Sequence, residues 1–209
     1  MRQSPSAMLA ASLVALLSGN LAAYPVLPQP RVVVRVFDTS GQPAPQLLAA
    51  LDEAAALMSR AALQVDWRIC QAAMTVDPCT SLMGRGERVV RIVSSPPGSV
   101  ASGRLPLGNA ILDARASTGV LATVYFDRAV KMASQNNCDQ NTLLGRTIAH
   151  ELGHLLLGTN AHAGFGLMRA VWTMEELRLN RWSDWKFSDR EAAAMRHNAS
   201  QAVQTVTGR

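Results

Sequence analysis

The chain has 209 residues, of which 48% are hydrophobic, and this length and composition suit one domain with its own core. Its formal net charge is +5, and the excess is almost entirely arginine, because Lys131 and Lys186 are the only lysines among 20 basic residues. The arginines are scattered along the chain, whereas nucleic-acid-binding proteins gather basic and aromatic residues on one face, so we expect no nucleic-acid partner.

The N-terminus has the composition of a secretory signal peptide. Arg2 precedes an apolar run over residues 7–17, and small residues follow as far as Ala23. The run is short for a membrane-spanning helix, so we expect cleavage after Ala23 rather than the alternative, an uncleaved N-terminal anchor. Residues 1–23 are then the signal peptide, and residues 24–209 form one catalytic domain that is secreted or periplasmic and has no stable membrane anchor.

Short β-branched segments, separated by turns rich in proline and glycine, predict a β-sheet. A strand, a helix and then further strands indicate an α+β fold, in which a mixed twisted sheet is packed with helices. The strand over residues 107–112 is expected at an edge of the sheet, and the strand over 119–126 in a buried position. The other predicted strands cover residues 31–37, 65–70 and 88–93, and the first helix covers residues 46–62.

The chain has three cysteines. Cys70 and Cys79 bracket a turn that contains Pro78, and they can form a small disulfide loop in an oxidising compartment. Cys138 is left over, as a buried thiol or an intermolecular partner. No C-x-x-C spacing occurs, so we do not expect a zinc site built from cysteines.

The stretch His150-Glu151-Leu152-Gly153-His154 lies in a segment that predicts a helix. Side chains four residues apart stand on one face of a helix, so the two imidazoles can bind one tetrahedral zinc ion. Glu151 lies between them and can reach the water at the metal as a general base. The helix is expected to begin near residues 141–142 and to end at Gly158.

A stripe of leucine and isoleucine runs along this helix, nearly opposite the two histidines. The stripe is expected to face the core, so that the histidines face a cleft that a substrate can enter. It consists of Leu144, Ile148, Leu152, Leu155 and Leu156.

A third histidine, His162, and a methionine, Met168, follow the helix. Over residues 142–168 the chain resembles the zincin metallopeptidases, and among them the metzincins. The resemblance implies a zincin-like fold, Zn²⁺ as the cofactor and a tight turn that places Met168 beneath the metal. The ligands that it implies are His150, His154 and His162, with Glu151 as the catalytic base.

The spacing of these residues departs from the metzincin pattern, which is H-E-x-x-H-x-x-G-x-x-H. Here three residues precede Gly158 and three more precede His162. One extra helical residue rotates the exit of the helix by about 100°, and one extra loop residue can restore the reach. The alternative third ligand is a glutamate on a following helix, Glu175 or Glu176, as in another branch of the zincins. The tyrosine that usually follows the methionine is also missing, and Trp172 is the only aromatic residue nearby.

Two further helices are expected, over residues 171–181 and 188–200, with a turn at 182–185 between them. Ser188-Asp189-Arg190-Glu191 is a capping-box pattern at the start of the second helix. His197, on that helix, is expected to be a solvated surface residue rather than a ligand.

Together these features predict an exported zinc metallopeptidase. Its partner would be a peptide or protein substrate that lies extended along the strand at 107–112. Two alternatives stay open: a zinc-bearing binding or inhibitory protein with the same fold and no turnover, and a zinc amidase acting on cell-wall or small-molecule amides.

Overall fold

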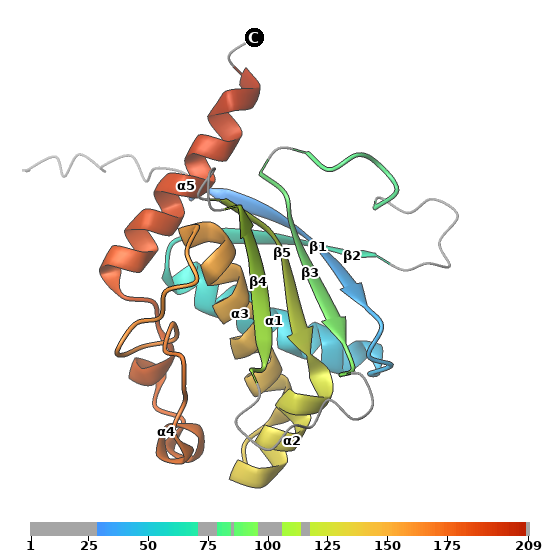
Figure 1. The fold of residues 1–209 in the computed structure, drawn as a ribbon, viewed down its shortest axis with the longest axis vertical. Coiled ribbons are helices and arrows are strands. Elements are labelled where there is room, and N and C mark those ends of the chain that lie inside the picture. Colours follow the sequence, from blue (N-terminus) through green and yellow to red (C-terminus); the bar gives the residue numbers. More distant parts are fainter. Residues whose placement is uncertain (1–28, 71–78, 85, 96–105, 114–117, 208–209) are drawn as a thin grey trace, which may run out of the picture.

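The computed structural model describes residues 29–70, 79–84, 86–95, 106–113 and 118–207. These residues form a five-stranded sheet with two long helices packed against one face (Figure 1). The predicted signal peptide, residues 1–23, lies outside the described residues. Within the described part, no helix has both the length and the apolar character needed to cross a bilayer.

The five strands are β1 (Arg31–Asp38), β2 (Gln64–Cys70), β3 (Arg88–Val93), β4 (Gly108–Asp113) and β5 (Thr118–Tyr125). Their order in the sheet is β2-β1-β3-β5-β4. β1, β2, β3 and β5 run parallel to one another, and β4 pairs antiparallel with β5 at the edge. The predicted α+β class and the edge position of the strand near 107–112 are therefore confirmed.

Two helices, α1 (Ala44–Arg60) and α3 (Gln140–Leu157), cover one face of the sheet (Figure 1). β1 directs alternate side chains toward this face, and Val34 and Val36 are fully buried there. Gly145 allows the two helices to approach closely, because a Cβ at this position would lie 2.5 Å from a backbone oxygen of α1. α3 is thus fixed beside α1 on this face of the sheet.

α3 packs against other elements over most of its surface, and the face that carries the two histidines lines a cleft, as the sequence predicted. Every residue from Leu143 to Leu156 is buried, because other elements pack around the helix on the side away from the leucine stripe as well. The helix begins at Gln140, next to the predicted start near 141–142. Asp139 is its cap, and the side chain of Asp139 accepts a hydrogen bond from the backbone N–H of Thr142.

Helix α2 (Phe126–Asn136) follows β5 directly and was not predicted. It ends at Asn137, which adopts a left-handed conformation with φ of 51°. The side chains that it buries are small or polar, namely Ala129, Ala133 and Asn136. Its sequence therefore lacks the run of large apolar residues that identifies α1 and α3.

The C-terminal part of the chain contains three more helical segments. These are α4 (Met174–Leu179), the 3-10 helix η1 (Trp182–Trp185) and α5 (Asp189–Thr207). α4 is shorter than the predicted helix over 171–181, because a capping box at Thr173 begins it and a left-handed residue, Asn180, ends it. The predicted capping box of α5 is confirmed, since Ser188 and Glu191 each accept a hydrogen bond from the other's backbone N–H.

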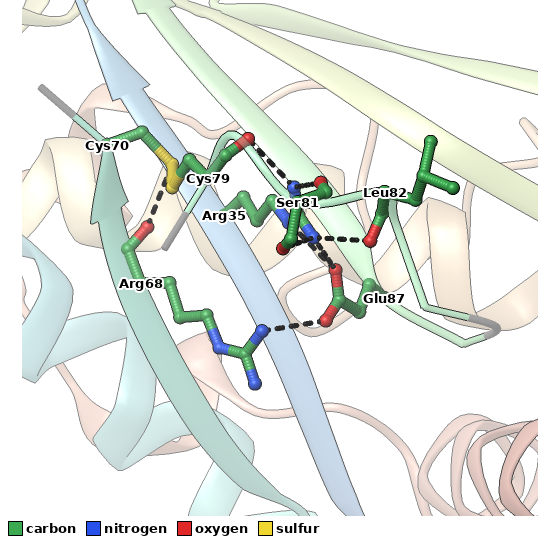
Figure 2. Close-up of a disulfide and its surroundings, with 7 residues drawn as sticks. All are labelled: Arg35, Arg68, Cys70, Cys79, Ser81, Leu82 and Glu87. Atoms are coloured by element: carbon green, nitrogen blue, oxygen red, sulfur yellow. Dashed lines mark hydrogen bonds and ion pairs between the residues drawn. A yellow bond between two sulfur atoms is a disulfide. The ribbon is translucent and has the colours of Figure 1, made fainter. Parts of the chain in front are cut away.

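The predicted disulfide joins Cys70, at the end of β2, to Cys79 (Figure 2). The guanidinium group of Arg35 on β1 is buried beside it and donates hydrogen bonds to three carbonyl oxygens of the loop that begins at Cys79. Glu87 lies 2.7 Å from this guanidinium and offsets its charge. The cluster lies on the β2 side of the sheet, opposite the β4 edge. Cys138 is free and partly buried.

Candidate metal centre

His150 and His154 lie one turn apart on α3 and direct their imidazoles toward each other. Nδ1 of His150 lies 2.8 Å from the carbonyl oxygen of Leu167, and Nδ1 of His154 lies 2.8 Å from that of Thr159. A carbonyl oxygen can only accept a hydrogen bond, so each Nδ1 carries the proton and each Nε2 keeps a lone pair. The two Nε2 atoms face each other at 3.0 Å.

Burial favours the neutral form of both rings. Loss of solvation lowers the pKa of His150 to about 4, and it also lowers the pKa of His154. Two lone pairs cannot hydrogen-bond to each other, so the approach of the two rings is favourable only with a cation between them. In a tetrahedral site with zinc–nitrogen bonds of about 2.0–2.1 Å, the ligand nitrogens lie roughly 3.3 Å apart, which is close to the observed spacing.

His162 joins the two helical histidines in one cluster. The potential ligand atoms of the three residues all lie within 4.8 Å of one another. The centroid of the His162 ring is 5.3 Å from that of His150 and 4.8 Å from that of His154. No other group of three histidine, cysteine or acidic side chains gathers in this way among the described residues. The remaining histidine, His197, is exposed on α5, as predicted.

The loop after α3 accommodates the longer spacing between the second and third histidines. Gly158 ends the helix in a left-handed conformation with φ of 66°, and its N–H donates to the carbonyl oxygen of His154. The chain then folds back, because Thr159 accepts from the imidazole of His154 and its hydroxyl group accepts from the N–H of Ala161. Despite the extra residue on each side of the glycine, His162 therefore still lies beside His150 and His154.

Glu151 is buried next to the histidines, with 5% of its surface exposed. Its Oε2 atom has no hydrogen-bond partner, and burial raises the pKa of the carboxyl group to about 8. An unpartnered buried carboxyl group destabilises a fold, and such groups are typical of sites that carry acid–base chemistry. Glu151 and the three histidines line a cleft of about 400 Å³.

The start of the edge strand β4 and the two residues before it form one wall of this cleft, over residues 106–110. The carbonyl oxygen of Leu107 accepts a hydrogen bond from the N–H of Tyr125, so the backbone groups of Leu107 point toward β5. Backbone groups alternate in direction along an antiparallel strand, so those of Gly108 and Ala110 point away from β5. The cleft is therefore bordered by unpaired main-chain groups of a sheet edge.

Met168 lies against the motif helix, beside Gly153. Its side chain is fully buried, and a Cβ at Gly153 would lie 2.7 Å from its sulfur atom. The turn before it depends on Gly166, which has a φ of 76° and leaves no room for a Cβ beside the carbonyl oxygen of Lys186. The methionine thus supports α3 one residue before His154.

An aromatic cluster beneath the site was not predicted from the sequence. The carbonyl oxygen of Leu167, which accepts from His150, also accepts from the indole N–H of Trp172 at 3.2 Å. The Trp172 ring packs edge to face against His150 and against Trp185. The guanidinium group of buried Arg146 lies 3.9 Å from the centroid of the Trp185 ring. These contacts join segments that are distant in sequence, so no local pattern reveals them.

The two glutamates considered as an alternative third ligand lie outside the histidine cluster. Glu176 accepts a hydrogen bond from the N–H of Thr173 in the capping box of α4, and it also forms an ion pair with Arg169. Glu175 is exposed and pairs with Arg181. Among the candidates for the third metal ligand, the structure therefore brings only His162 to the two histidines of α3.

Comparison with known proteins identifies the fold. No protein-family model and no curated protein sequence match this chain. Among solved structures, it is similar to archaemetzincin from Methanopyrus kandleri, with a TM-score of 0.50 and 18% identity. The similarity covers 85% of this chain and 99% of that one. The metzincin-like fold that the sequence predicted is therefore confirmed.

Proposed function

We propose that the chain is an exported zinc metallopeptidase that hydrolyses peptide bonds, with Glu151 as the general base. The proposal is carried by one observation, a buried carboxyl group without a partner for Oε2 beside three converging imidazoles. Three protein ligands leave a tetrahedral zinc ion one open position, which is characteristic of catalytic rather than structural sites. The metzincin-like fold supports the same assignment.

His150, His154 and His162 would hold the ion. The carbonyl oxygens of Leu167 and Thr159 fix the tautomer and orientation of the two helical rings, as outer-shell partners of ligand histidines commonly do. Zinc bound in such a site lowers the pKa of a water molecule to about 7 and polarises the carbonyl group of the substrate. The protein's own contribution is a rigid set of nitrogen donors in a cleft.

Glu151 would take a proton from the attacking water and deliver it to the leaving amine. Its carboxyl group suits this role because it lines the same cleft as the histidines and Oε2 is not engaged elsewhere. A cation in the cleft favours the ionised carboxylate and so opposes the effect of burial on its pKa. With the cation bound, the base would be charged at neutral pH.

A peptide fits this cleft better than a compact amide does. The main-chain N–H and C=O groups of Gly108 and Ala110 point away from β5 and can pair with an extended peptide as an added strand. A small amide would leave most of this edge unpaired. The substrate class that we propose is therefore an extended peptide segment.

Export is the second part of the proposal. The Cys70–Cys79 disulfide supports it, because disulfides persist mainly in oxidising compartments. The composition of residues 1–23 supports it as well. We propose that the mature chain is secreted or periplasmic.

Metal analysis combined with cleavage of a mixed peptide library tests the proposal. We expect about one zinc ion per chain, cleavage that a chelator abolishes, and recovery when zinc is restored. Zinc without cleavage of any peptide would instead favour the binding or inhibitory protein. Cleavage confined to cell-wall fragments would favour the amidase, and absence of zinc binding would contradict all three.

A further inference from the structure

A glycine of the edge strand lies directly against the proposed base. Gly108 is the first residue of β4, and it is buried. A Cβ at this position would lie 2.7 Å from both Cγ and Oε1 of Glu151, and 2.8 Å from its carboxyl carbon. Favourable contacts between carbon atoms lie at about 3.5–4.0 Å, so a side chain at position 108 would displace the carboxyl group.

The requirement for glycine at this position is steric. Gly108 is not among the glycines with positive φ, so its backbone conformation is open to other residues. The three heavy atoms nearest to the added Cβ all belong to Glu151. What excludes a side chain at position 108 is therefore the carboxyl group itself.

The two helical histidines are held by hydrogen bonds, whereas Oε2 of Glu151 has no such partner. A glutamate side chain loses substantial rotamer freedom when it is fixed, and no hydrogen bond of Oε2 offsets this loss. A Cβ at Gly108 would lie within 2.8 Å of the carboxyl group, so the backbone of β4 runs close to this group and limits how far it can swing away from the cleft.

We infer that Gly108 is a positioning residue for Glu151: its bare backbone packs on the carboxyl group and holds it in the cleft beside the histidines. The catalytic role of this positioning rests on the proposed function, whereas the packing of Gly108 against Glu151 is independent of it. Gly108 also presents main-chain groups to the free edge of the sheet. One residue therefore aligns both the base and the main chain of a bound peptide.

A cycle of substitutions measured by thermal unfolding of the full chain tests the contact without any assay of activity. Gly108→Ala is expected to lower the Tm by several degrees, because the new methyl group meets the Glu151 side chain. In a Glu151→Ala background that side chain is gone, so adding Gly108→Ala should leave the Tm unchanged. If Gly108→Ala alone fails to fold, the double variant still tests the contact, because we expect it to fold as Glu151→Ala does.

Two other glycines provide matched controls. A Cβ at Gly119 would meet Leu112 and Leu155, so Gly119→Ala should lower the Tm equally with and without the Glu151 side chain. Nothing lies within 4 Å of a Cβ at Gly164, so Gly164→Ala should leave the Tm unchanged. A Tm loss in Gly108→Ala that Glu151→Ala does not relieve would overturn the inference, and so would a wild-type Tm in the single variant.

We expect the Gly108→Ala substitution to slow turnover without weakening zinc binding. Gly108→Ala should keep the zinc affinity of the wild type, because the contact does not involve the histidines. Its kcat on a cleaved library peptide should fall at least tenfold with little change in KM, and Gly164→Ala should match the wild type. An unchanged kcat would contradict the positioning role. If the wild type cleaves no peptide, the proposed function fails while the unfolding cycle still decides the contact.

Discussion

The Nε2 atoms of His150 and His154 face each other at 3.0 Å, while both Nδ1 atoms donate to backbone carbonyl oxygens. Two lone pairs therefore point at one place in the cleft, and burial makes protonation of either ring unfavourable. A divalent cation at this place would stabilise the folded chain. The unfolded chain, in which the ligands are apart, would bind it less well.

Replacing His162 by alanine removes a proposed zinc ligand. Loss of an outer-shell partner of a ligand typically weakens metal binding by roughly 10–100-fold, so we expect a larger loss of zinc affinity here. His162 is exposed, so the metal-free variant should unfold like the wild type. Competition with a chromophoric chelator measures the affinity. Glu175→Ala is the control and should bind zinc normally, whereas the opposite pattern would assign the third position to the glutamate.

Acid should remove the stabilising contribution of neutral His150 from the metal-free chain over a defined window of pH, while buried Glu151, with its pKa raised to about 8, contributes in the opposite direction between about pH 8 and pH 4.5. The pKa of His150 is about 4 in the folded chain, against an ordinary value of 6.5, so the unfolded chain takes up the proton first. Its contribution is therefore intact above about pH 6.5 and is lost progressively down to about pH 4, by roughly 3 kcal/mol in total. The difference between wild type and His150→Asn in urea unfolding at several pH values measures this loss. A His150→Asn variant with the same acid dependence as the wild type would show that the loss arises elsewhere.

The features of the site that arise within one segment could be predicted from the sequence. The spacing of His150 and His154 and the helix end at Gly158 are local, because periodicity and a left-handed glycine determine them. The contact between Gly108 and Glu151 could not be predicted, since it depends on how the edge strand β4 packs against α3. The burial of α3 beyond its stripe of leucines likewise depends on neighbours that the stripe does not reveal.

Met168 should contribute packing beneath the helix rather than chemistry at the metal. Met168→Ala would leave a cavity in a fully buried place beside Gly153, and it is expected to lower the free energy of unfolding by roughly 2–5 kcal/mol. Met168→Leu keeps the volume and should lose less than about 1.5 kcal/mol. Urea unfolding and zinc titration of both variants check this. Loss of zinc binding in the stable leucine variant would mean that the sulfur atom itself matters.

Removing the disulfide should affect stability and spare the metal centre. Cys70 and Cys79 are nine residues apart, and closing a loop of this size in the unfolded chain is worth roughly 2–3 kcal/mol in the chain-entropy description. The bridge lies on the β2 side of the sheet, away from the β4 wall of the cleft. The double variant Cys70→Ser, Cys79→Ser should therefore unfold at lower urea concentration and bind zinc with unchanged affinity. Weakened zinc binding in the folded double variant would show that the two regions are coupled.

The most direct test of the proposed chemistry is the Glu151→Gln variant, assayed for zinc content and for cleavage of the peptide library in parallel with the wild type. Glutamine has the same size and keeps the contact with Gly108, but it cannot take a proton from water. We expect the variant to bind zinc as the wild type does and to cleave at least about 100-fold more slowly. Cleavage at the wild-type rate by a zinc-loaded Glu151→Gln variant would contradict the assignment of Glu151 as the general base.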